Sequence, residues 1–231
     1  MRNLRKLITL TTLFAAAVLL VGLTTALADP IQTFNANATG TFGNGSCSTC
    51  TAAGNTITST GGGGSSIITF SSNSPELIAT LVPGQSAFVT LGVLNATSEI
   101  PSGAAGPNFI GATFTLNISF TVPNDASPDP GVFTGTLSGQ IVQGASSTFI
   151  QWTSPTTLTF SSPTAGTFTL MIESLTPVNT PSDPNNTRVR AVLTYTAAPI
   201  PEPATLILLS TGLLGVAGLA KRKNKNGTAQ V

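Results

Sequence analysis

Apolar and polar side chains alternate between residues 112 and 122, and this pattern constrains the fold more than any other feature of the chain. Threonine, asparagine and serine fill every second position, and the apolar positions between them are Phe114, Leu116, Ile118, Phe120 and Val122. Successive side chains of a β-strand point to opposite faces of a sheet. The pattern therefore predicts a strand with one buried face and one solvated face.

The same period of two recurs along the rest of the chain, at residues 86–94, 132–142, 156–160, 167–175 and 188–196. Turn-forming clusters such as Pro83-Gly84 and Pro128-Asp129-Pro130-Gly131 separate these segments. No helical period appears between the two apolar ends of the chain. We therefore expect an all-β domain over residues 67–198, a single antiparallel β-sandwich of jelly-roll-like type.

Residues 29–66 have a different composition, rich in Asn, Gly, Ser and Thr, and include the run Gly61-Gly62-Gly63-Gly64-Ser65-Ser66. The glycine run is expected to form a flexible loop, because too little apolar sequence precedes it to build a core. We therefore assign residues 29–66 to an N-terminal segment ahead of the sandwich.

Charge is sparse and segregated along the chain. Charged residues make up 7% of the sequence, and seven of the nine basic residues lie at the two ends, leaving only Arg188 and Arg190 between them. All eight acidic residues lie between Asp29 and Glu202, so this part carries two positive and eight negative charges and contains no lysine or histidine. Such a segment lacks the Lys/Arg footprint that attracts phosphate backbones, which excludes nucleic acid as a partner.

The N-terminus has the order of parts of a secretory signal peptide. A basic start (Arg2, Arg5, Lys6) precedes an apolar run over residues 7–23 and the small-residue pattern Ala26-Leu27-Ala28. We expect export by the Sec machinery and cleavage by signal peptidase after Ala28, so that residues 1–28 are removed. The alternative is a permanent N-terminal anchor, because the apolar run is slightly longer than is usual.

The C-terminus has a second apolar segment, residues 204–220, followed at once by Lys221, Arg222 and Lys223. As a helix this segment would reach roughly 25 Å, the short limit for crossing a bilayer. Cations directly behind it favour a cytoplasmic tail, with the sandwich outside. A buried core helix is the alternative, but here apolar residues occupy every face. The expected precursor is anchored in the inner membrane.

A family resemblance joins these C-terminal parts. Pro201-Glu202-Pro203-Ala204-Thr205, the apolar helix and the Lys221–Lys223 cluster together resemble the PEP-CTERM sorting signal of Gram-negative bacteria, within residues 199–231. The resemblance implies recognition by an exosortase, a membrane-embedded cysteine transpeptidase-like enzyme that processes its substrates near Pro-Glu-Pro. It also implies a set of exported proteins often linked to exopolysaccharide and biofilm, whose destination is the cell envelope, surface or extracellular matrix.

The C-terminus differs from the usual family pattern in its length. Eight residues, 224–231, follow Lys223, whereas members of the family usually end close to the basic cluster. The β-rich part of the chain also resembles, in general texture, the small β domains of the choice-of-anchor group that precede such signals.

Cys47 and Cys50 are the only cysteines, and they stand in the segment Cys47-Ser48-Thr49-Cys50. A zinc site would need two more nitrogen or sulfur ligands, and the chain has no histidine to supply them. Outside the cytoplasm the two thiols are expected to pair as a structural disulfide. A redox motif is the alternative, but that motif belongs at the start of a helix in a βαβ unit.

Asp125 and Asp129, with Ser127 between them, space oxygen ligands as the first half of a calcium loop does. The pattern then fails, because Pro130 and Thr136 stand where an EF-hand needs glycine and glutamate. A solvated turn is the favoured interpretation, with calcium as the alternative.

Catalytic groups are scarce. Serine or cysteine nucleophiles lack a histidine or lysine base in this part of the chain, and nothing in the sequence brings any two of Glu76, Glu99 and Glu173 together as a glycosidase pair. We expect Trp152 to lie in the core or at its rim. The first hypothesis is therefore a non-catalytic structural or adhesive protein without cofactors; the second is a carbohydrate-binding or carbohydrate-cleaving β-sandwich with extracellular polysaccharide as its partner.

Overall fold

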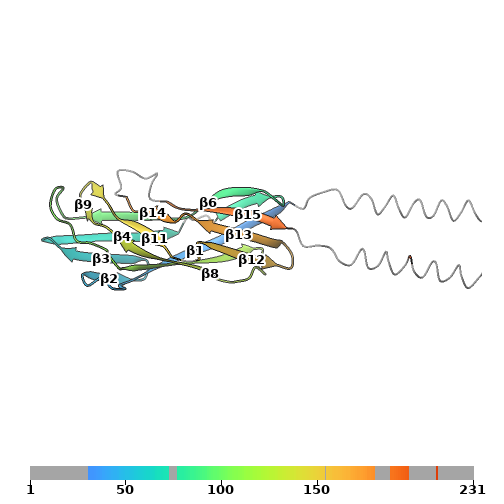
Figure 1. Ribbon diagram of the computed structural model, residues 1–231, viewed down its shortest axis with the longest axis horizontal. Helices are drawn as coiled ribbons and strands as arrows, with labels where there is room; N and C mark the ends of the chain where they lie inside the picture. The colour runs from blue at the N-terminus through green and yellow to red at the C-terminus, as the bar shows by residue number, and fades with distance from the viewer. Residues whose placement is uncertain (1–30, 73–76, 154, 180–187, 198–211, 213–231) are drawn as a thin grey trace, which may run out of the picture. The chain divides into compact units, whose positions relative to one another are not determined.

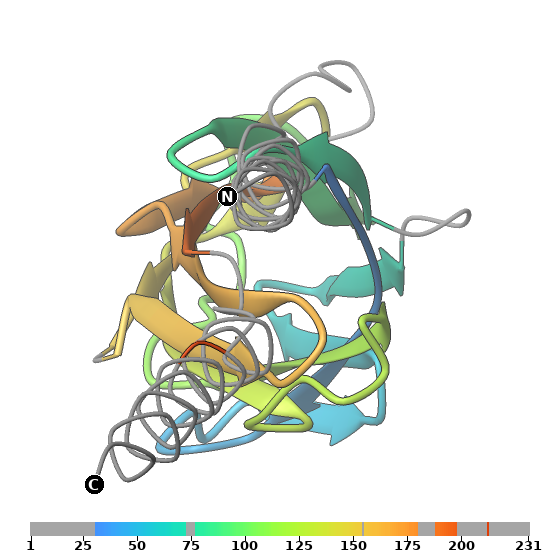
Figure 2. The same ribbon diagram turned by 90° about the vertical axis from the view of Figure 1, so that its right-hand side faces the viewer.

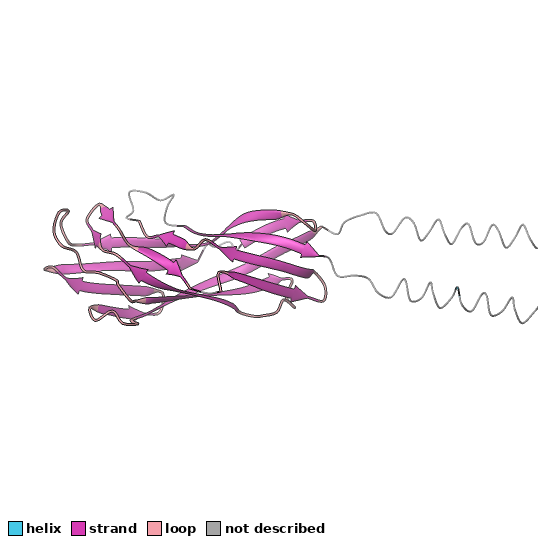
Figure 3. Cartoon of the chain, in the orientation of Figure 1, coloured by secondary structure: helices cyan, strands magenta, loops and turns pink. Residues whose placement is uncertain are grey.

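The computed structural model describes residues 31–72, 77–153, 155–179, 188–197 and 212. Within these residues the fold is all-β, and strands dominate the chain throughout (Figure 3). Two antiparallel sheets pack face to face, which confirms the expected antiparallel sandwich. The described parts of the sheets hold six and seven strands, more than the eight in total of a jelly roll.

The first sheet, here called sheet A, has the strand order β14-β11-β8-β7-β1-β5. Its strands are β1 (Gln32–Gly43), β5 (Leu77–Leu81), β7 (Thr113–Val122), β8 (Gly131–Ser138), β11 (Phe149–Trp152) and β14 (Leu175–Pro177). The longest pairing joins β1 to β7, with Gly43 opposite Thr113 and Asn35 opposite Val122. The first strand of the described chain therefore lies beside a strand from its middle, about 75 residues further along the sequence.

The second sheet, sheet B, has the order β12-β13-β15-β6-β4-β3-β2. Its strands are β2 (Cys50–Ala53), β3 (Thr56–Gly61), β4 (Gly64–Ser72), β6 (Ser86–Ser98), β12 (Thr157–Ser162), β13 (Gly166–Ile172) and β15 (Arg188–Ala197). A short hairpin of β9 (Ile141–Val142) and β10 (Ala145–Ser146) stands apart from both sheets. All six segments predicted from the period of two lie on strands of the structure, although two of them each span more than one strand.

The assignment of residues 29–66 to a segment ahead of the sandwich is wrong, because the sandwich begins at Gln32. β1 lies between β7 and β5 in sheet A and buries every second side chain from Phe34 to Phe42. The inward positions between these rings carry only Ala36, Ala38 and Gly40. Their small size hides the period of two from a search for large apolar residues, although the period is present.

The glycine run is a tight hairpin and not a flexible loop. Gly61 pairs with Gly64, so that only Gly62 and Gly63 connect β3 to β4. Both have positive φ, 62° and 87°, the backbone that a two-residue hairpin turn with φ > 0 at both positions requires. Glycine adopts this region without a steric cost, and the run therefore fixes the register of two strands.

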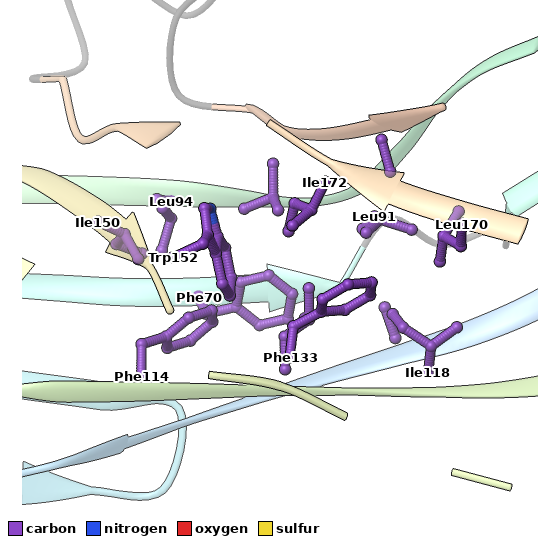
Figure 4. Packing of buried hydrophobic residues seen from close by; sticks show 14 of the residues in the cluster. Phe70, Leu91, Leu94, Phe114, Ile118, Phe133, Ile150, Trp152, Leu170 and Ile172 are labelled. Atoms are coloured by element: carbon purple, nitrogen blue, oxygen red, sulfur yellow. The ribbon is translucent and has the colours of Figure 1, made fainter. Parts of the chain in front are cut away.

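Aromatic rings fill the space between the sheets (Figure 4). The ring centroid of Phe114 lies 5.4 Å from that of Phe70 and 5.8 Å from that of Trp152. Phe114 is fully buried and Phe120 is 5% exposed, which confirms the predicted inward face from Phe114 to Phe120. The prediction is wrong for Val122, which is 38% exposed at the end of β7. Trp152 is buried as expected, and its Nε1 donates a hydrogen bond to Thr176 Oγ1 at 2.8 Å.

The chain enters and leaves the sandwich at the same end, which we call the base (Figures 1 and 2). Gln32 pairs with Leu81, and the nearby Gly84 N–H donates to the carbonyl oxygen of Tyr195 at 2.7 Å. The opposite end, the tip, is made of residues 44–49, 62–63, 99–112 and 139–147. The strands between base and tip form the two walls around the core.

The chain divides after Ala198 into two compact units, residues 1–198 and residues 199–231. The expected signal peptide, residues 1–28, and the expected helix over 204–220, apart from Gly212, lie outside the described residues. Among the residues that the structure describes, no helix is long and apolar enough to cross a membrane.

Replacing Phe114 or Phe120 with alanine should lower the free energy of unfolding by about 3 kcal/mol or more, because each change removes a buried ring and leaves a cavity. Thr39→Ala, at an exposed position of β1, is the matched control and should change it by less than about 0.5 kcal/mol. Urea denaturation of the three variants measures the difference. Equal midpoints for the phenylalanine variants and the parent would contradict the assigned core.

Candidate functional site

Cys47 and Cys50 are joined by a disulfide at the tip. Both are 7% exposed, and Cys50 opens β2, where it pairs with Ser59 of β3. Reactive cysteines are accessible to a partner thiol and are commonly activated at a helix start, whereas both cysteines here are buried and Cys50 begins a strand. The arrangement suits a structural bond that holds the chain between β1 and β2.

A hydrogen-bond cluster beside the disulfide holds the long tip loop. The buried Ser59 Oγ donates to the carbonyl oxygen of Asn108 at 2.8 Å and lies 2.9 Å from Thr49 Oγ1. The backbone of this loop is also bound to the segment that follows β1, because Ser46 N–H donates to the Gly111 carbonyl oxygen at 3.0 Å. These contacts order the tip but bring no pair of catalytic groups together.

Asp125 lies in the turn between β7 and β8, and its hydrogen bonds join this turn to the one between β12 and β13. Its carboxylate accepts hydrogen bonds from Ser162 Oγ at 2.5 Å, from Thr164 Oγ1 at 2.9 Å and from Thr164 N–H at 3.2 Å. The Ser162 hydroxyl, followed by the Thr164 donors, lowers the pKa of Asp125, although partial desolvation opposes them. The oxygens that a calcium ion would use are thus engaged by hydroxyl and amide donors.

Asp129, the second residue of the weak calcium candidate, is exposed in the same turn. No group of three or more Asp, Glu, Cys or His side chains within the described ranges could hold a metal ion. The favoured interpretation of this segment is a solvated turn. In the structure the hydrogen bonds of Asp125 to Ser162 and Thr164 hold that turn in place, and Asp129 is exposed to solvent.

The glutamates considered for glycoside chemistry are spread along the molecule. Glu99 lies just beyond the tip end of β6, where its Oε2 accepts a hydrogen bond from Ser65 Oγ at 2.9 Å. Glu173 lies near Thr90, nine residues earlier along β6, a separation of roughly 30 Å along a strand. Carboxylates that cleave a sugar bond stand within about 10 Å of each other. Glu76 lies outside the described residues.

Sheet B has a hollow on its outer face, here called the sheet B hollow, with a volume of about 300 Å³. Its lining comes from β6, from β15 and from the residue that follows β13: Phe88, Val89, Thr90, Glu173, Arg188 and Arg190. Phe88 is 82% exposed, an unusual position for a phenylalanine ring. Arg188 and Arg190 are the only cations between the two chain ends, and both line this one site.

The strand pairing explains why these side chains meet. Arg188 and Arg190 stand two positions apart on β15, so they point to the same face. Beside them the register of β6 shifts, because Val189 pairs with Gly92 whereas Arg190 pairs with Thr90. The extra residue, Leu91, forms a β-bulge, a feature that bends a strand and re-aims its side chains.

Sequence reasoning missed Phe88, although a signal was present. Because its two neighbours in 86–94, Ala87 and Val89, both face the core, Phe88 stands between them at an outward position. The partners of Phe88 could not be found in this way, since Arg188 and Arg190 lie about a hundred residues further along the chain. Only the pairing of β6 with β15 brings them together.

A comparison with protein families matches residues 199–223 to the family described as the PEP-CTERM protein-sorting motif. This confirms the resemblance read from Pro201, Glu202, Pro203, Ala204 and Thr205 with the basic flank Lys221, Arg222 and Lys223, all of which lie outside the described residues. The chain thus carries a sorting signal of exported proteins that an exosortase recognises. Neither the curated proteins nor the solved structures contain a match to this chain.

Replacing Asp125 with asparagine should lower the thermal midpoint at neutral pH, because the charged carboxylate accepts its hydrogen bonds more strongly than an amide oxygen does. The pKa of Asp125 is lowered in the folded state, so this contribution is present above the unfolded pKa of about 3.9 and is lost as the pH falls through the folded value. The difference from the parent should therefore shrink at acid pH.

Asp129→Asn, at the exposed carboxylate of the same turn, is the matched control and should follow the parent at every pH. A difference for Asp125→Asn that persists unchanged into strong acid would contradict the assignment. If added calcium raised the midpoint of the parent but not of Asp125→Asn, the carboxylate would be a metal ligand instead.

Proposed function

We propose that this chain is an exported, non-catalytic surface or extracellular-matrix protein, with a structural or adhesive role in an exopolysaccharide or biofilm setting. The observation that carries the proposal is the PEP-CTERM protein-sorting motif at residues 199–223. On this account the Sec machinery exports the precursor, signal peptidase removes residues 1–28, and the C-terminal segment holds it in the inner membrane. An exosortase then processes it for the cell envelope, the surface or the matrix.

The sandwich suits such a role because its outer faces carry many hydroxyl groups and few charges. One row of hydroxyl side chains crosses four neighbouring strands of sheet B. Each member is paired with the next across the sheet, in the order Thr159, Thr169, Thr194 and Ser86. Thr194 Oγ1 and Ser86 Oγ lie 2.8 Å apart within this row. Neutral hydroxyl surfaces interact with hydrated polysaccharide through hydrogen bonds and without charge repulsion, which favours a matrix setting.

The topology adds support from the direction of the chain. The sorting signal follows β15, which ends at the base, so the base is the end of the sandwich that adjoins the anchor in the chain. The tip loops, braced by the disulfide and by the bonds to Asn108, stand at the opposite end.

A carbohydrate-binding role is the second candidate, and the sheet B hollow is the observation that favours it. The exposed ring of Phe88 beside two arginines provides the aromatic platform that Trp152, buried in the core, does not. Carbohydrate cleavage receives no such support, because Glu99 lies beyond the tip end of β6 whereas Glu173, which follows β13, lies near Thr90 in the other half of β6.

The sorting proposal predicts the mass of the mature protein in a host that has an exosortase. The wild-type protein should lose Lys221 to Val231 together with the apolar segment, whereas Glu202→Ala should keep them, because the change alters the motif and leaves the segment and its cations intact. Intact-mass measurement of the protein purified from the envelope or medium reads the difference directly.

Glu99→Ala is the matched control, since it removes a glutamate outside the motif and should be processed like the wild type. A wild-type mass that still includes residues 221–231 would show a simple membrane anchor and would contradict exosortase processing. Loss of the segment from Glu202→Ala at the wild-type rate would show that the Pro-Glu-Pro glutamate is not read.

A further inference from the structure

We propose that the sheet B hollow binds an acidic sugar residue of a polysaccharide, with Arg188 and Arg190 pairing its carboxylate and Phe88 stacking on its ring. The proposal deepens the adhesive role, and it rests on that role only for bringing extracellular polysaccharide to the protein. Each of the three chemical features of such a sugar, its carboxylate, its apolar ring face and its hydroxyls, has a counterpart in the lining.

The carboxylate follows from the distribution of charge. The part of the chain between the two ends carries eight acidic residues and only two arginines, yet both arginines line one hollow together with a single carboxylate, Glu173. The lining is thus net positive within a part of the chain in which acidic residues outnumber basic ones. The planar guanidinium group of arginine matches a carboxylate with two parallel hydrogen bonds, a geometry that lysine does not offer.

Phe88 provides an apolar surface for one face of the sugar ring. Its side chain is 82% exposed, and the strand register sets it beside Val192 of β15, which in turn stands opposite Met171 of β13, 50% exposed. An apolar row therefore runs across three strands next to the arginines. The face of an aromatic ring carries partial negative charge and attracts the polarised C–H bonds that line one face of a sugar ring.

The hydroxyls follow from Glu173 and Thr90, which complete the rim. A carboxylate only accepts hydrogen bonds, and a sugar supplies hydroxyl donors close to its carboxylate. The side chain of an acidic peptide residue brings a carboxylate without hydroxyl donors beside it, so it leaves Glu173 unmatched. The volume of about 300 Å³ is at the small end of ligand sites, which fits one sugar ring held at the surface while the polymer continues on both sides.

The hollow is built on a rigid floor. Val89 is buried, and Gly92, in the bulge beside the arginines, lies against the ring of Phe70 in the core. A β-carbon added at Gly92 would overlap that ring, so the backbone here is held at the closest approach that glycine permits. A preformed floor reduces the ordering cost of binding.

Isothermal titration of the exported protein, purified in detergent, tests the proposal with trigalacturonate as the acidic probe and trigalactose as the neutral probe. Trigalacturonate should bind and trigalactose should bind much more weakly, and the acidic affinity should fall as salt is raised. Arg190→Gln and Phe88→Ala should each weaken trigalacturonate binding about tenfold, and Arg190→Lys, which keeps the charge without the fork, should lie between.

Leu175→Ala is the matched control, since it trims another half-exposed apolar residue, on sheet A, and should bind like the parent. Equal affinity for both sugars, no binding of trigalacturonate, or unchanged affinity in Arg190→Gln would overturn the proposal. Tighter binding of hexaglutamate than of trigalacturonate would assign the hollow to an acidic peptide instead. Thermal midpoints of the variants show that they are folded. The mass measurement on Glu202→Ala is independent of all these outcomes, so sorting and sugar binding can fail separately.

Discussion

The ring of Phe70 lies between two glycines, one from each sheet, and the close approach of strands to this ring shapes much of the sandwich. A β-carbon at Gly40 of β1 would come within 2.5 Å of Phe70 Cδ1 and 2.6 Å of Phe114 Cζ, and one at Gly92 of β6 would also overlap the Phe70 ring. Protein cores are close-packed, so a ring that fills the place of two side chains fixes how the facing strands sit.

The same contact links the core to the outer face of sheet B. Gly92 belongs to the bulge at Leu91, and this bulge sets the register of β6 against Arg190 and Arg188. The hollow beside Phe88 thus depends on a backbone path that the core ring dictates. Core packing and the placement of glycines thus position Arg188 and Arg190 in a chain that has few charges. The sorting signal at the C-terminus directs the sorting of the protein that carries them.

The sequence predicts the fold well wherever large and polar residues alternate, as between Phe114 and Phe120. It fails for β1, because Ala36, Ala38 and Gly40 give a weak apolar signal, and their inward role follows only from rings such as Phe70 that fill the space opposite them. The sorting motif is local and was legible from Pro201 to Lys223. The hollow was not, since it combines outward residues of strands far apart in the chain, and no local pattern specifies which strands become neighbours.

A double-mutant cycle on Gly40 and Phe70 tests the central claim most directly. Gly40→Ala alone should lower the free energy of unfolding by about 1–3 kcal/mol through overpacking. In a Phe70→Leu background the added methyl group gains room, so the same change should cost at least about 1 kcal/mol less, and the two effects should not add. Urea unfolding of the four proteins measures this coupling. Strictly additive effects would contradict the account, because they would mean that the Phe70 ring does not occupy the space that Gly40 leaves open.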